Sequence, residues 1–211
     1  MTVKETEILR EKLQNSCDLL IQRIGQIQIG STDLFPYGWR KAAKGRTVWR
    51  IVEEVITQNL EKYHNDFNLD SIHSSDSEVT VYDMKCVYGD LAAYINIKSA
   101  VLGGKRQKDD ISKAEGLKAF YEDDIDKQFF VATFFIQFNA NMSIEITKVI
   151  VFPIAWIPDI YVNPSNNGNL QSAYYKDLGD AVKRTNNQFV PLLHDAIQIA
   201  DKKKQEKKKK K

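Results

Sequence analysis

The sequence predicts a mixed central β-sheet flanked by helices, of the α/β or α+β class. Two segments with helical spacing precede two β-rich segments at hairpin spacing, and apolar strands and two more helical segments follow. The length of 211 residues and the 43% hydrophobic content are enough for one good core. Residues 1–200 are therefore expected to form a single domain.

The first helix is predicted within residues 1–28 by an apolar stripe with charged residues between its members. The stripe steps by four and three residues and consists of Leu13, Cys17, Leu20, Ile24 and Ile27. Such a stripe is typical of a helix that packs on another helix. It fits a helix lying on its own core and a contact with a second copy of the chain equally well.

A second helix is predicted from about Thr47 to Tyr63, after a stretch rich in Gly, Pro and aromatic residues. Its apolar face consists of Val48, Ile51, Val52, Val55, Ile56 and Leu60. The polar residues 65–78 link this helix to a predicted β-hairpin, in which EVTVYDMKCVY and LAAYINIKSAV are joined by the turn Gly89-Asp90.

The later elements follow from spacing and composition. Residues 111–124 have helical spacing, and residues 128–138 and 145–157 are apolar enough to be buried strands. Residues 158–172 are rich in Asn, Pro and Gly, which is typical of turns. Residues 186–203 begin like a capped terminal helix.

The net charge of +2 conceals an asymmetry along the chain. Residues Lys202 to Lys211 contain eight lysines and one glutamate, or +7, which leaves −5 for the residues before them. We expect residues 201–211 to be a disordered tail that adds only nonspecific attraction or solubility. Nucleic-acid binding by the residues before this tail would need local basic stretches such as GWRKAAKGR and GGKRQK.

Several classes of protein are disfavoured by composition. Cys17 and Cys86 are the only cysteines and lie in different predicted elements, so a disulfide framework or a cysteine-rich zinc site is not expected. No apolar run is long enough to span a membrane, and the N-terminus is charged and amphipathic. The three histidines have no ligand spacing, and no Ser-His-Asp or Cys-His order is evident. These features predict a cytoplasmic protein without a membrane partner.

A constellation with chemical potential lies on the hairpin. Asp83 is on its first strand, and Asn96 and Lys98 share one face near the end of its second, because strand side chains alternate. An acid, an oxygen ligand and an ammonium would thus converge at one end of the sheet. Phosphodiester hydrolysis needs these groups: a carboxylate for Mg²⁺, and a lysine that orients water or stabilises added negative charge. Alone, the pattern also fits a solvated hairpin face.

Further segments extend the pattern. The hairpin resembles the core of the PD-(D/E)XK nucleases, and its surroundings resemble the blunt-cutting, EcoRV-like and HincII-like branch of the type II restriction endonucleases. KGRTVWRIVEEVITQNLEKYH resembles the helix before the core, INIKSAV a D-I-K-T-like strand end, and ISKAEGLKAFY the following helix. YVNPSNNGNLQSAYYKDL resembles the recognition segment and RTNNQFVPLL the closing helix. The resemblance covers roughly residues 35 to 200 and is most specific in the hairpin and in residues 161–178.

This resemblance implies a restriction-endonuclease-like core and an enzyme of a restriction-modification system. Such an enzyme hydrolyses double-stranded DNA with Mg²⁺, or with Mn²⁺ in its place, to 5′-phosphate and 3′-hydroxyl ends. Asp83, Asn96 and the Ile97 backbone carbonyl would be metal ligands, and Lys98 would position the attacking water. A palindromic site would require a homodimer with twofold symmetry. The implied location is a bacterial or archaeal cytoplasm.

Two residues depart from the family pattern. Tyr82 replaces the motif's Pro, which carries no chemistry, and Asn96 replaces the second acidic ligand. An amide oxygen binds a hard cation without adding charge, so metal affinity should fall. Asn96 is then either a natural variant ligand or a substitution that inactivates the enzyme. Relatives often place a helix carboxylate near the metal, so Glu53 or Glu54 is a further candidate beside the alternative of a solvent-exposed pair, while Asp90 in the turn is expected to be structural.

DNA contacts are predicted in two segments. Amide side chains suit adenine edges, and basic ones suit guanine and phosphate. The turn after the second hairpin strand and the later Asn- and Gln-rich loop have these side chains, although each could be only a solvated turn. The predicted DNA-binding residues are Lys105, Arg106, Gln107, Lys108, Asn163, Asn166, Asn167, Asn169, Gln171 and Arg184.

Two alternatives to a restriction endonuclease remain at this point. A structure-specific repair or junction nuclease would keep the same core, but the amide-rich loop favours base reading. A sequence-specific DNA-binding protein with an inactive site would explain Asn96. Cleavage of linear and branched duplexes, with and without divalent ions, distinguishes the three.

Overall fold

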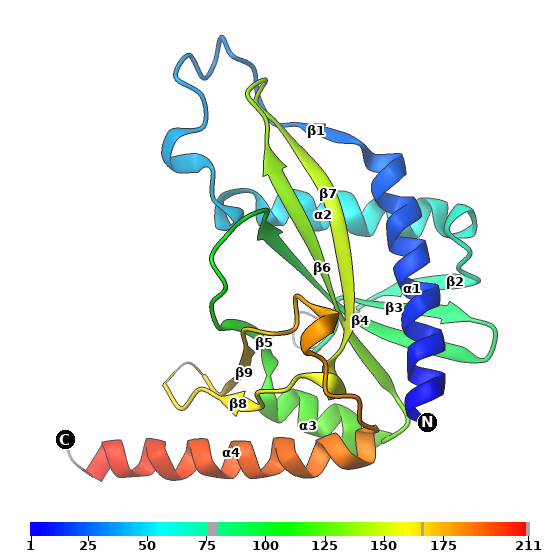
Figure 1. Ribbon diagram of the computed structural model, residues 1–211, viewed down its shortest axis with the longest axis vertical. Coiled ribbons are helices and arrows are strands. Elements are labelled where there is room, and N and C mark those ends of the chain that lie inside the picture. The colour runs from blue at the N-terminus through cyan, green and yellow to red at the C-terminus, as the bar shows by residue number, and fades with distance from the viewer. Residues whose placement is uncertain (76–79, 166, 210–211) are drawn as a thin grey trace.

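The structure is a computed structural model that describes residues 1–75, 80–165 and 167–209 (Figure 1). A six-stranded sheet has the strand order β1-β7-β6-β4-β3-β2, and a smaller sheet has the order β5-β9-β8. Strands β4 and β6 run parallel, whereas the other paired strands run antiparallel. The strands are β1 (Gln26–Gln28), β2 (Ser71–Ser74), β3 (Met84–Tyr88), β4 (Leu91–Val101), β5 (Asp109–Lys113), β6 (Gln128–Phe138), β7 (Ser143–Pro153), β8 (Tyr161–Val162) and β9 (Asn169–Ser172).

Helices flank the larger sheet, so the predicted mixed sheet with flanking helices is confirmed. The α-helices are α1 (Val3–Ile24), α2 (Gly45–Tyr63), α3 (Ala114–Asp123) and α4 (Asn186–Lys209). Short 3-10 helices are η1 (Arg40–Ala42), η2 (His64–Phe67), η3 (Ile154–Trp156) and η4 (Leu178–Asp180). In the described part of the chain, none of the helices combines the length and the apolar character that crossing a bilayer requires.

Strand β6 divides the apolar core in two, because its alternate side chains point to opposite faces. Phe130 and Phe134 pack with α1, α2 and the β3–β4 hairpin, while Phe129 and Val131 pack with α3 and α4. Both cysteines lie buried and unpaired in the first of these clusters. The stripe predicted on the first helix therefore packs on the core of the same chain.

Strand β4 is internal in the sheet, and the β3–β4 hairpin places the carboxyl end of β4 where the strands of the sheet end. Gly89 in its two-residue turn has a φ of 60°, a conformation that glycine adopts without strain. The chain then leaves β4 through residues 102–108, forms β5 and α3, and returns as β6 parallel to β4. A crossover of this kind is required between parallel neighbours. Segments far apart in sequence thereby meet at the end of β4.

Several elements differ from their predicted form. Of the strand predicted at 78–88, residues 78–79 lie outside the described part of the chain, and the described part forms a strand over Met84–Tyr88. The helix predicted from 111 begins at Ala114, because Ile111 belongs to β5. The segment predicted as turns contains the short strands β8 and β9, which bury Val162 and Leu170. Burial of these two apolar side chains packs the paired strands on the core, although turn-forming residues surround them.

The lysine-rich end of the chain is helical over its described residues, not disordered as expected. Helix α4 continues through Lys209, and residues 210–211 lie outside the described part of the chain. Lysine, glutamine and glutamate are good helix formers, and adding residues to an existing helix is easy. Lysines in a last turn also interact favourably with the helix dipole.

Candidate functional site

The structure brings Asp83, Asn96 and Lys98 together beside the end of the β3–β4 hairpin. The Asp83 backbone N–H donates to the Ile95 carbonyl with an N–O distance of 2.8 Å, so pairing extends one residue beyond β3. The Asp83 carboxylate oxygen Oδ2 then accepts from the Ile97 backbone N–H at 2.6 Å. All three side chains line one pocket of about 480 Å³.

The two ends of the Asn96 amide have different surroundings. Its Nδ2 donates to the Val81 carbonyl at 3.3 Å, which fixes the orientation of the amide. Its Oδ1 is buried and accepts no hydrogen bond from any described residue. A buried polar atom without a partner is costly in a folded protein and marks a position where a missing partner is expected.

Charge and burial act in opposite directions on the ionisable groups. Burial raises the pKa of the Asp83 carboxyl, and the Ile97 N–H and the charge of Lys98 oppose this shift. Burial lowers the pKa of the Lys98 amine, and the charges of Asp83 and Glu53 oppose that shift. The three groups are thus close enough to interact within a poorly solvated site.

Of the two candidate helix carboxylates, Glu53 belongs to this group and Glu54 does not. Burial, followed by the charge of Asp83, raises the pKa of Glu53. Arg50 lies near it, with 3.9 Å between Nη1 and the Glu53 oxygen Oε2. Glu54 is exposed at the pocket rim, and its Oε1 accepts from Gln58 Nε2 at 2.6 Å. The register of α2 therefore turns Glu53 towards the hairpin.

These oxygens suit a hard divalent cation. Asp83 and Glu53 supply carboxylates, and Asn96 Oδ1 is a buried acceptor. The Ile97 carbonyl lies on the Asp83 side of β4, because the N–H and C=O of a strand residue point towards the same neighbour. Across the described ranges, no three His, Cys, Asp or Glu side chains converge as a metal-binding group. The candidate set therefore depends on amide and backbone oxygens beside two carboxylates.

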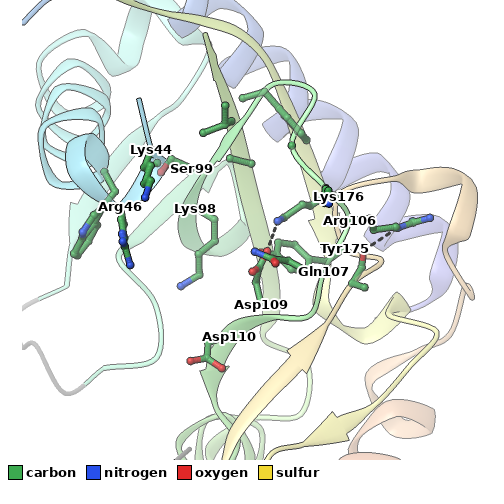
Figure 2. Close-up of a pocket in the computed structure, with 18 of the residues that line it drawn as sticks. Lys44, Arg46, Lys98, Ser99, Arg106, Gln107, Asp109, Asp110, Tyr175 and Lys176 are labelled. Atoms are coloured by element: carbon green, nitrogen blue, oxygen red, sulfur yellow. Dashed lines mark hydrogen bonds and ion pairs between the residues drawn. The ribbon is translucent and has the colours of Figure 1, made fainter. Parts of the chain in front are cut away.

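A larger groove adjoins the pocket and shares Lys98 with it. This groove has a volume of about 1150 Å³, and Trp49 and Ile97 also line both spaces. Lys44 and Arg46 approach from one side of Lys98, while Asp109 and Asp110 lie on the other (Figure 2). The residues just before and at the start of α2, the end of β4 and the loop after it therefore form one continuous concave surface.

The cations of the loop at 102–108 divide into two kinds. Arg106 forms an ion pair with Asp180, and its Nε donates to the Ala173 carbonyl at 3.0 Å. Lys108 lies over the Tyr161 ring, with its Nζ 4.2 Å from the ring centroid. Lys105 is exposed and lines the groove with Gln107. Two of the three predicted phosphate contacts, Arg106 and Lys108, are therefore engaged within the chain. Lys105 and Arg106 both line the groove.

The predicted base-reading residues form part of a hydrogen-bonded row. Gln171 Nε2 donates to Asp110 Oδ1 at 2.5 Å, and its Oε1 accepts from Asn163 Nδ2 at 3.3 Å. Asn167 has a φ of 52° in the turn that leads to Asn169 at the start of β9. Asn166 lies outside the described residues. Gln171 is thus oriented by Asp110, a residue that the sequence analysis did not select.

Other residues fall outside the groove or were missed. Arg184 donates from Nη1 to the Ile157 carbonyl at 2.9 Å and lines an apolar hollow beside α4. Asp90 is exposed in the hairpin turn, as predicted. Lys148 and Lys176 line the groove from β7 and from the segment after β9. They escaped sequence analysis because only the fold brings these segments to the end of β4.

No protein-family model matches the chain, and no curated protein matches its sequence. The geometry of the site is therefore the basis for a functional proposal.

Proposed function

We propose that this protein is a Mg²⁺-dependent endonuclease of the type II restriction endonuclease kind, acting on double-stranded DNA. The observation that carries the proposal is the position of Lys98. Lys98 lines both the pocket that contains Asp83, Asn96 and Glu53 and the adjoining groove of about 1150 Å³. Lys44, Arg46 and Lys105 are exposed at that groove and supply positive charge for phosphates.

Each residue has a role in hydrolysis. Asp83, Glu53 and Asn96 Oδ1 would hold Mg²⁺, with the Ile97 carbonyl as a further ligand. The ion supplies Lewis acidity to the scissile phosphate and lowers the pKa of a water ligand. Lys98 orients the attacking water and stabilises the negative charge that develops on the phosphate. The water oxygen bonds to phosphorus, and the bond to the 3′ oxygen breaks, leaving a 5′-phosphate and a 3′-hydroxyl.

The assembly belongs to the same proposal. A palindromic site requires two copies related by a twofold axis, each cutting one strand. The enzyme would act as a homodimer in a bacterial or archaeal cytoplasm, within a restriction-modification system.

Incubation with plasmid and phage DNA in Mg²⁺ tests the proposal. Discrete fragments are expected from the wild type, and none from the variant Lys98→Ala, which should still bind DNA. End sequencing of the fragments then gives the recognition site. A smear, cleavage confined to branched substrates, or the absence of cutting even after Asn96→Asp would refute the proposal.

The Asn96 amide favours a second candidate, a sequence-specific DNA-binding protein that does not cut. The proposed ligand set contains two carboxylates, Asp83 and Glu53, and its third side-chain ligand, Asn96 Oδ1, is uncharged. This candidate predicts site-specific binding, and no cleavage with Mg²⁺ or Mn²⁺ by either the wild type or Asn96→Asp.

A further inference from the structure

The C-terminal part of α4 projects from the body as a basic rod, defined here as residues 201–209. Ala200 is the last buried residue of the helix, and every residue of the rod is exposed. At 1.5 Å per residue, the rod is about 14 Å long. It contains six lysines against Asp201 and Glu206.

The rod lies beside the proposed DNA-reading segment. Lys207 Nζ donates to Ser165 Oγ at 3.2 Å, and Ser165 belongs to the loop between β8 and β9. Figure 1 shows that the end of α4, this loop and the loop between β4 and β5 project at the same edge of the molecule. The rod therefore extends the positively charged edge beyond the groove.

The lysines of the rod form two groups around the helix. Lys203 and Lys207 are one turn apart, and Lys204 is three residues before Lys207, so these three lie on one side. This is the side that reaches Ser165. At 100° per residue, the remaining described lysines are centred on the opposite side, with Lys202 and Lys209 facing away and Lys208 at the boundary, about 40° from Lys204.

Electrostatics favour a polyanion as the partner of this side. Like charges one turn apart, such as Lys203 and Lys207, repel each other and destabilise an isolated helix. Neighbouring phosphates would remove that repulsion and release counterions. We propose that Lys203, Lys204 and Lys207 bind the phosphate backbone of the duplex that flanks the DNA in the groove. This inference rests on the proposed nuclease function.

Salt-dependent binding to duplex DNA tests the inference. The full chain is titrated in EDTA with a duplex of about 40 base pairs and with one of about 12, over about 50 to 200 mM KCl. The triple variant Lys203→Gln, Lys204→Gln, Lys207→Gln should lose about two to three units of the salt slope on the long duplex, and less than one on the short duplex. Glutamine preserves helix propensity, so the rod should remain folded.

The matched control is Lys202→Gln, Lys208→Gln, Lys209→Gln, which removes the same charge from the other side of the same helix. It should lose less than one unit of slope on either duplex. Equal losses in the two triple variants would indicate only diffuse attraction, and no loss in either would exclude contact, so both results overturn the inference.

Further outcomes distinguish a failure of the inference about the rod from a failure of the nuclease proposal. If the first triple variant loses binding to anionic lipid vesicles while its DNA slope stays unchanged, the rod binds membranes and the inference is wrong. If the wild type cleaves DNA but the two triple variants behave alike, the inference fails and the nuclease proposal stands. If the wild type neither binds nor cleaves any duplex, both the inference about the rod and the nuclease proposal are refuted.

Discussion

At Asn96, the amide nitrogen is bonded to Val81 whereas the amide oxygen is buried without a described donor. This asymmetry means that an aspartate at the same position would lose one hydrogen bond and add a charge close to Asp83. A bound divalent cation would compensate both effects, because it attracts the added charge and supplies a partner for the oxygen. The effect of the substitution therefore depends on the metal.

For Asn96→Asp, we predict lower stability without metal and faster cleavage with it. The lost donor and the added repulsion should cost about 1–3 kcal/mol in EDTA, and Mg²⁺ should raise the melting temperature more than it does in the wild type. An added charge at the metal worth about 2–4 kcal/mol in the transition state would raise the cleavage rate roughly 30- to 1,000-fold. Single-turnover cleavage and thermal unfolding measure these changes, and DNA affinity should be nearly unchanged. An equal or slower rate would identify Asn96 as a tuned natural ligand.

The adjacent carboxylates of α2 give a matched pair of variants. Glu53→Gln removes a charge that interacts with Asp83, whereas Glu54→Gln removes one that accepts a hydrogen bond from Gln58 at the rim. We predict that the first weakens Mg²⁺ binding at least tenfold and that the second changes it less than twofold, since one lost charge interaction of about 1.4 kcal/mol corresponds to tenfold. Calorimetric titration with Mg²⁺ measures both affinities. Equal effects would show that α2 contributes only through its overall charge.

At the scale of elements, the loop at 102–108 is attached to the segment after β9 by Arg106, which contacts Asp180 and Ala173. The pair formed by Lys176 and Asp109 adds a second attachment (Figure 2). Both segments line the groove, so these contacts shape the wall opposite Lys44 and Arg46. A cation in this loop can therefore either hold the loop in place or bind a ligand.

The two roles are separable by exchange and binding experiments. Arg106→Gln should increase amide hydrogen exchange at residues 102–108 and 173–180. In this variant, local opening of these residues no longer has to break the contacts of Arg106 with Asp180 and Ala173. Lys105→Gln should leave exchange unchanged and reduce the salt slope of DNA binding by about one. If Arg106→Gln leaves exchange unchanged and acts only on the salt slope, Arg106 is a phosphate contact as the sequence predicts.

The elements predicted well from sequence are those whose periodicity is strong. The strands at 91–101 and 128–138 were predicted with their observed bounds, and the second helix begins within two residues of its predicted start. The short strands β8 and β9 were missed because two or three buried residues give no periodic signal among turn formers. The grouping of Asp83, Asn96 and Lys98 was predicted from the hairpin, since strand alternation and one turn determine it. Glu53 and Asp110 could not be singled out, because their positions depend on long-range packing.

At the scale of the molecule, one sheet separates two apolar clusters. Ile56 of α2 lies in the first cluster and Phe189 of α4 in the second, and both side chains are fully buried. Strand β6 contributes alternate residues to both clusters, so neither can loosen without disturbing the same backbone. A shared central strand therefore predicts that residues 1–200 unfold as one unit.

Two core variants test this prediction. Ile56→Ala should destabilise the protein by about 2–5 kcal/mol and Phe189→Ala by about 3–5 kcal/mol, because each leaves a cavity that a packed sheet cannot fully close. If the chain is one cooperative unit, each variant shifts a single transition, and circular dichroism and tryptophan fluorescence report the same midpoint in denaturant. If the clusters belong to separate units, each variant produces a two-step transition in which only its own cluster melts early. The second result would divide the proposed active site, on α2 and the hairpin, from the base-reading sheet beside α4, and DNA recognition could then be lost while the catalytic group stays folded.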